Sequence, residues 1–230
     1  GRLTEEPQLR RRVTTLGQSS ACTLGDLPPV MGYTVSDTAL VRGTRRVGWL
    51  LVVALSGYYL YRAIHYRFVV PDRLGPTLLN KQLWYATHLA AALPVIAGAP
   101  LQFIASLRSE RPDLHRWLGR AYVVGASIAA LTAIYLGAIV GEYEGSRLPL
   151  ALLGGLWLFF TLAAWRCAVR RQFRAHRLFM IRSYGLALVL VWLRLMFDAQ
   201  DWLFFYVTNA DLRDATREWA SWVVPLLLLE

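Results

Sequence analysis

The feature that most constrains this chain is a series of long apolar segments bordered by arginine-rich stretches. One of the clearest follows Arg174–Tyr184, a cationic stretch that carries His176, and continues from Gly185 to Phe197. A helix of about 20 mostly apolar residues is long enough to cross a bilayer. The composition agrees, because 56% of the residues are hydrophobic and nine are tryptophan, which soluble domains seldom reach. We therefore predict an all-α integral membrane helical bundle.

We expect five or six spans in this bundle. The apolar runs cover residues 47–64, 83–107, 117–140, 148–164 and 178–197, with a sixth run over 219–229. The sixth run is too short to cross about 30 Å of hydrocarbon. Residues 1–44 are polar and basic and predict a loose N-terminal arm, whereas 45–230 form the bundle. Arginines gather at 42–46, 108–120 and 166–177, so we place these loops and the arm in the cytoplasm.

The formal net charge of +10 comes almost wholly from arginine. Because these arginines lie between apolar segments, anionic lipid headgroups are their expected partners and nucleic acid is not. Two cysteines, Cys22 and Cys167, are too few for a disulfide framework or a cysteine metal cage. The residues 198–218 are acidic and aromatic and predict a loop along the interface.

The four histidines occupy two depths of the expected bundle. His65 and His88 fall near the outer face, and His115 and His176 near the cytoplasmic face. Along the second span, His88 is about 27 Å from the cytoplasmic boundary at the usual helical rise. A single zinc ion bound by three of these histidines is therefore excluded unless the chain folds back. Two imidazoles at one depth instead suit the iron of a haem, which takes axial ligands from neighbouring helices.

A repeated motif accompanies the two cytoplasmic-side histidines. His115-Arg116 is followed by Arg120 and Tyr122, and His176-Arg177 by Arg182 and Tyr184. We expect His115 and His176 to face one cavity and ligate a haem b, with His88, alone or together with His65, holding a second one. The arginines of the motif would neutralise the propionates of the haem or a lipid phosphate, or simply anchor cytoplasmic loops. These arginines are Arg116, Arg120, Arg177 and Arg182.

The leading hypothesis for function is a haem b electron carrier, or a haem-bearing subunit of a larger redox or respiratory complex. An alternative is a non-catalytic accessory subunit that packs against other membrane subunits or further copies of itself, which the small and aromatic residues would also serve. An intramembrane enzyme acting on a lipid or isoprenoid is the third. Two other polar residues have simpler expected roles: Asp198 pairs with Arg194 at i, i+4, and Gln102 satisfies a carbonyl freed by Pro100.

The histidine motifs resemble those of a known family. His88, the stretch Gly98–Phe103, His115–Tyr122 and His176–Tyr184 are similar to a bacterial membrane family known as domain of unknown function 2306, over about residues 45–200. The resemblance implies a multi-helix protein of the bacterial inner membrane and no settled activity. A looser similarity connects the bundle to two-haem transmembrane cytochromes b, although those proteins carry their ligands within four consecutive helices in a tighter pattern.

Overall fold

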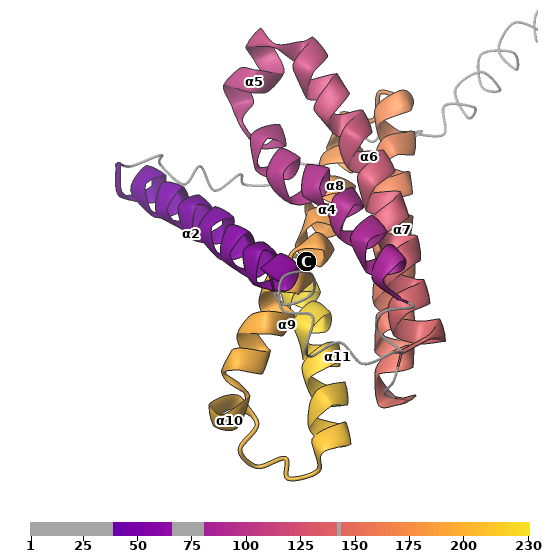
Figure 1. Ribbon diagram of the computed structural model, residues 1–230. Helices are drawn as coiled ribbons and strands as arrows, with labels where there is room; N and C mark the ends of the chain where they lie inside the picture. The colour runs from indigo at the N-terminus through magenta and orange to yellow at the C-terminus, as the bar shows by residue number, and fades with distance from the viewer. Residues whose placement is uncertain (1–38, 66–80, 142–143) are drawn as a thin grey trace, which may run out of the picture. The chain divides into compact units, whose positions relative to one another are not determined.

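The structure, a computed structural model, describes residues 39–65, 81–141 and 144–230. The chain divides into two compact units, 1–44 and 45–230, and the second contains every candidate membrane span of the described residues. Every regular element in these described ranges is a helix, which confirms the prediction of an all-α membrane bundle (Figure 1).

The described helices are numbered in chain order. Their bounds are α2 Ala39–Ile64, α4 Gln82–Gln102, α5 Ala105–Glu110, α6 Pro112–Ile134, the π-helix η3 Tyr135–Ile139, α7 Glu144–Val169, α8 Phe173–Ala187, α9 Val189–Asp198, α10 Gln200–Leu203 and α11 Ala210–Leu228. Because η3 continues α6 and α9 continues α8, the long helices are fewer than the elements.

Four helical segments in the described part of the chain are long and apolar enough to cross a membrane. These are Arg46–Ile64, Pro112–Ile139, Glu144–Val169 and Phe173–Asp198. The number is below the five or six that we predicted. The difference lies in α4, which has a glutamine at each end, and α11, whose first half is polar; both also contain prolines.

Two segments differ from the prediction in their local structure. The expected 83–107 span ends at Gln102, because Pro100 lies in its last turn and Phe103 turns back to bond the Pro100 carbonyl at 3.3 Å. The expected loop over 198–218 contains α10 and the start of α11. Helix α11 begins at Ala210 because the side chain of Asn209 accepts a hydrogen bond from the Leu212 N–H, as an N-cap residue does.

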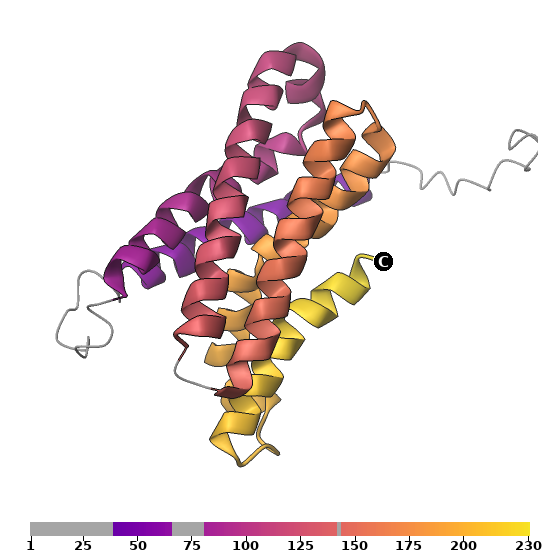
Figure 2. The same cartoon turned by 90° about the vertical axis from the view of Figure 1, so that its right-hand side faces the viewer.

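Small residues allow the helices of the bundle to approach closely. Helix α4 packs on α6, α6 on α7, α7 on α8, and α11 on both α7 and α9, and Figure 2 shows α6, α7 and α8 side by side. At Gly125 of α6 an added Cβ would lie 2.5 Å from the Ala91 carbonyl oxygen of α4. Such contacts replace the hydrophobic effect as the source of helix association in lipid.

A buried hydroxyl network joins three of these helices. Ser183 Oγ of α8 lies 2.8 Å from Tyr122 Oη of α6 and 2.8 Å from Thr161 Oγ1 of α7. All three side chains are fully enclosed. The short α7–α8 turn, in which Arg171 has a φ of 59°, brings the start of α8 back along the end of α7. The network and the turn together hold the two histidine-bearing helix starts at the same end of the bundle.

Candidate functional site

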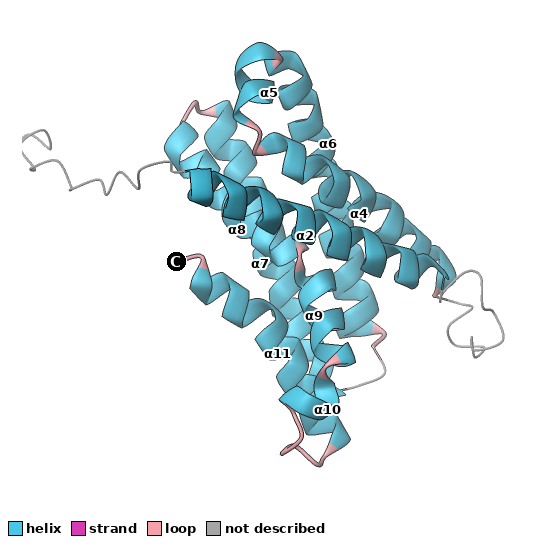
Figure 3. Ribbon diagram, turned by 90° about the vertical axis from the view of Figure 1, so that its left-hand side faces the viewer, coloured by secondary structure: helices cyan, strands magenta, loops and turns pink. Residues whose placement is uncertain are grey.

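A chamber of about 480 Å³ lies between α2, α4, α6, α7, α8 and α9. Figure 3 shows α2 running obliquely across the helices that form the rest of the wall. The lining residues that matter for its chemistry are Tyr59, Arg62, Tyr85, His88, Trp157, Leu190, Leu193, Arg194 and Asp198. Ligand sites in proteins have volumes of roughly 300–1,000 Å³, so the chamber is large enough for a small molecule.

The chamber is polar towards one end and apolar towards the other. Its charged residues come from the last turns of α2 and α9, represented by Arg62 and Asp198, and His88 comes from the second turn of α4. The remaining lining includes Val95, Trp157 and further aliphatic side chains from the helix interiors. This distribution suits an amphipathic molecule with its polar group near the helix ends.

His88 is held by α6 in a defined orientation. Its Nδ1 lies 3.0 Å from the Ala129 carbonyl oxygen and 3.1 Å from Thr132 Oγ1. A carbonyl oxygen only accepts hydrogen bonds, so Nδ1 carries a proton and donates it. In the neutral imidazole, Nε2 then has the free lone pair, and no hydrogen bond to a described residue occupies that atom. His88 therefore offers an acceptor, or a metal ligand, to the chamber.

An ionic cluster joins α2 to α9 at the polar end. Tyr59 Oη donates to Asp198 Oδ2 at 3.2 Å, and the Arg62 guanidinium donates to the same oxygen at 2.6 Å. The side chains of Arg62 and Asp198 are 46% and 36% exposed, so the pair lies at the mouth of the chamber. The partners of Asp198 thus come from a distant helix, beyond the local Arg194 pairing that the i, i+4 spacing suggested.

His115 and His176 also lie near one another. The Nδ1 of His176 donates to the Ala164 carbonyl at 2.9 Å, whereas the buried Nδ1 of His115 has no hydrogen-bond partner among the described residues. The backbone carbonyl of His115 accepts from Gln102 Nε2 at 2.9 Å. Gln102 therefore connects α4 to α6. The sequence had instead suggested that it bonds a carbonyl freed by Pro100. The histidine pair lines neither the His88 chamber nor the hollow beside Arg116 on α6.

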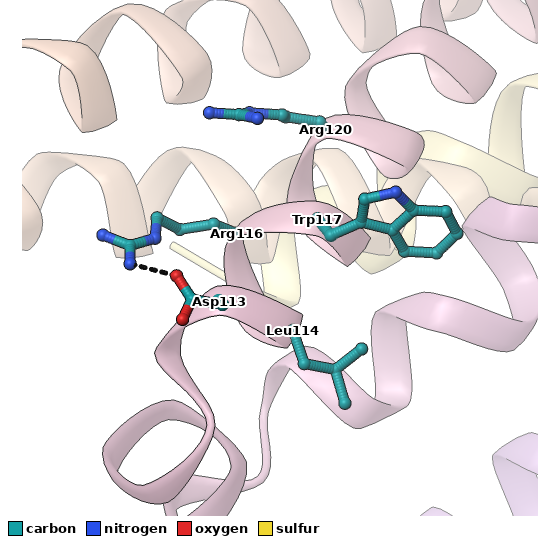
Figure 4. A pocket seen from close by; sticks show the side chains of 5 residues that line it. All are labelled: Asp113, Leu114, Arg116, Trp117 and Arg120. Carbon is teal, nitrogen blue, oxygen red and sulfur yellow. Dashed lines mark hydrogen bonds and ion pairs between the residues drawn. The ribbon is translucent and has the colours of Figure 1, made fainter.

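The four motif arginines do not gather around that pair in a single network. Arg182 forms a bidentate ion pair with Glu230, with distances of 2.5 and 2.6 Å. Arg116 pairs with Asp113 in the first turn of α6, while Arg120 and Arg177 are exposed. In Figure 4, Arg116 and Arg120 extend to one side of α6 and Trp117 to the other. The hollow beside them, about 590 Å³, is lined by α6 residues alone and is a surface depression.

His65 differs from the other histidines. It follows the last residue of α2, is exposed, and lies against Tyr61 with ring centroids 5.6 Å apart. It is absent from the chamber lining, so His88 is the only histidine of the described residues there. The described residues contain no group of three or more histidine, cysteine, aspartate or glutamate side chains that could hold a metal ion.

Sequence reasoning missed several residues of the chamber. Tyr59 and Trp157 were not among the candidate residues of the sequence analysis, although both line the chamber. A signal existed for Asp198, since a carboxylate near the end of a membrane span requires a partner. The identity of that partner depends on which helices are neighbours.

A family profile described as "Predicted membrane protein (DUF2306)" matches residues 85–230. This covers more than half of the chain, and the chain belongs to that family. The match starts later than the resemblance over 45–200 and extends to residue 230, so it excludes α2 and includes α11. Comparisons with curated proteins and with solved structures returned no significant match. The looser similarity to cytochromes b therefore has no support from these comparisons.

Proposed function

We propose that this member of the DUF2306 family binds a small amphipathic molecule of the membrane, a lipid or isoprenoid, in the His88 chamber. One observation carries the proposal: a chamber of about 480 Å³ that is largely apolar contains an imidazole fixed through Nδ1. The apolar walls would hold the chain of the ligand. Nε2 of His88 would accept a hydrogen bond from its polar group, since ionisable side chains within membrane helices usually serve binding or transport.

Binding can be tested by lipid extraction from the purified protein followed by mass spectrometry. The variant Leu190→Trp fills the chamber, whereas Leu195→Trp adds the same bulk on α9 at a position outside the lining. We expect one lipid class to be enriched in the wild type and in Leu195→Trp, and lost in Leu190→Trp. His88→Ala should weaken its retention about tenfold, which is the effect of losing one buried hydrogen bond. Equal lipid content in all four proteins would contradict the proposal.

Haem b is a second candidate occupant, and a specific observation favours it. His88 and His176 each donate Nδ1–H to a backbone carbonyl, the arrangement that orients metal-bound imidazoles. In the chamber, His88 would supply one axial ligand, because no other described histidine lines it. At the opposite end of the bundle, His115 and His176 would supply two axial ligands to another haem. Bound haem would give the chain an electron-transfer role, with these residues setting the orientation of the group and its exposure to water.

The visible absorption spectrum distinguishes the two candidates. Protein produced with sufficient haem should display a Soret band that is weakened in His88→Ala and in His176→Ala, lost when both are replaced, and kept in His65→Ala. Absence of the band from the wild type would remove haem and leave the lipid proposal intact. The same proposal includes the location and the partners of the protein. It places the chain in the bacterial inner membrane, with anionic headgroups in contact with the basic loops, and in association with other subunits or with further copies of itself.

A further inference from the structure

The wall of the chamber formed by α2 is attached to the other helices differently from the rest. Helices α4, α6, α7 and α8 meet through extended rows of small buried residues such as Ala92, Ala126 and Ala129. Within the described part of α2, only Ser56 and Tyr59 are buried. Moreover, the family match starts at residue 85, so α2 lies outside the region that the family profile covers.

Two sets of contacts hold α2 in place. In the first half of α2, the Trp49 ring lies 5.3 Å from the Phe103 ring and 6.2 Å from the Tyr184 ring. Towards its end, Tyr59 and Arg62 share one oxygen of Asp198. Between them, the buried hydroxyl of Ser56 has no hydrogen-bond partner in the described part of the chain, so it adds no polar attachment of α2 to the other helices.

The second of these contacts is also part of the chamber. Tyr59, Arg62 and Ala63 line one side of it and Asp198 the other. The ion pair is half-exposed, and such pairs contribute little net stability. Separating α2 from α9 at this point would therefore cost little and would open the polar end of the chamber sideways, towards the bilayer.

We propose that α2 is a lateral gate, and that an amphipathic ligand with an acidic head group enters beneath it by replacing Asp198 as the partner of Arg62. An ionised acidic head supplies oxygens that match a guanidinium. The Tyr59–Arg62–Asp198 cluster is the latch of this gate. The inference rests on the proposed binding function, because it names the ligand class and the route of access.

The test compares oleate with its neutral methyl ester, using the full chain in nanodiscs with Cys22 and Cys167 replaced by serine. Spin labels at Tyr61→Cys on α2 and Trp202→Cys on α10, both exposed, report the opening of the gate as a distance distribution. Radiolabelled oleate and methyl oleate report binding. We expect oleate to bind about tenfold more tightly than the ester and to lengthen the label distance, whereas the ester leaves the distance unchanged.

Two latch variants make the inference falsifiable. Arg62→Gln should remove the preference for oleate and the distance response, while binding of the ester persists. Asp198→Asn should raise the share of the long distance by up to about fivefold without any ligand, because the modest contribution of the ion pair is lost. If both probes bind equally and Asp198→Asn leaves the distance unchanged, the gate is refuted and the binding function stands. If Leu190→Trp binds the probes as well as the wild type does, the binding function itself fails and the acidic ligand fails with it.

Discussion

At the scale of single residues, the side chains that organise this protein are those that form hydrogen bonds to two other helices at once. Ser183 is the clearest case, because its hydroxyl contacts both Tyr122 and Thr161 within a fully enclosed site. In lipid there is no water to replace a lost partner, although measured hydrogen bonds between membrane helices are modest.

Replacing Ser183 with alanine should therefore destabilise the bundle by about 1–2 kcal/mol. The alanine leaves the Tyr122 hydroxyl without this partner, whereas Thr161 keeps its bond to the Trp157 carbonyl at 2.8 Å. Unfolding of the detergent-solubilised protein by sodium dodecyl sulfate measures the change. Tyr122→Phe combined with Ser183→Ala should cost less than the sum of the two single variants. Simple additivity would show that the two hydroxyls are not coupled.

Glu218 of α11 makes stability depend on pH, and it lies outside the four candidate spans. Burial raises the pKa of Glu218 above its usual 4.5, against the opposing effects of Ser146 and Arg217, while Asp214 adds to the rise. A folded pKa above the unfolded value means that the folded state binds the proton more tightly. The contribution to stability is therefore full below pH 4.5 and declines as pH rises through the raised folded pKa.

The variant Glu218→Gln should remove this decline and raise the thermal midpoint at neutral pH. Glu144→Gln, which changes an exposed carboxylate at the start of α7, provides the control and should leave the pH profile unchanged. Thermal unfolding in detergent from pH 4 to pH 8 is the measurement. A Glu218→Gln protein that loses stability at neutral pH would mean that attraction to Arg217 outweighs the effect of burial.

At the scale of helices, close packing depends on glycines at particular faces. In α6, Gly125 faces the Ala91 carbonyl and Pro94 of α4. In α7, Gly155 has nothing within 4 Å of an added Cβ among the described residues. The two positions therefore separate the packing role of glycine from its low helix propensity.

Gly125→Ala should separate α4 from α6 and destabilise the protein by about 1–3 kcal/mol, the usual cost of overpacking. Gly155→Ala should be neutral or stabilising by up to about 1 kcal/mol, because alanine favours the helix and meets no neighbour. The same denaturation assay compares the two variants. Equal effects would indicate that the α4–α6 contact tolerates a methyl group.

The helices themselves were largely predictable, and their interruptions were not. Apolar runs located α6, α7 and the α8–α9 segment because lipid selects for length and hydrophobicity. The end of α4 depended on how the residues after Pro100 turned, and the start of α11 on the cap formed by Asn209. Both are local hydrogen-bonding choices that hydropathy does not report.

The candidate site was less predictable for the same physical reason. His88 attracted attention as an ionisable residue in a span, and its position in the chamber agrees with that reasoning. Pairing His65 with it required knowledge of where α2 ends relative to α4. Likewise, the Asp198 contacts with Tyr59 and Arg62 join residues far apart in the chain, and no sequence periodicity relates them.

At the scale of the whole molecule, the length of α6 with η3 determines which positions must face opposite sides of the membrane. Ser109 of α5 and Glu144 of α7 are exposed and lie on either side of the Pro112–Ile139 segment. That segment has 28 residues, long enough at the helical rise to exceed about 30 Å of hydrocarbon. The two positions should therefore lie on opposite sides of the membrane.

Single cysteines at these positions test the topology after Cys22 and Cys167 are replaced by serine. Because arginines are concentrated near Ser109, the positive-inside rule predicts that Ser109 faces the cytoplasm. A membrane-impermeant maleimide should label Glu144→Cys in intact bacterial spheroplasts, and Ser109→Cys only after the membrane is permeabilised. Labelling of both from outside would refute a crossing by α6. Labelling in the reverse order would keep the crossing, overturn the orientation, and place the mouth of the His88 chamber on the cytoplasmic side.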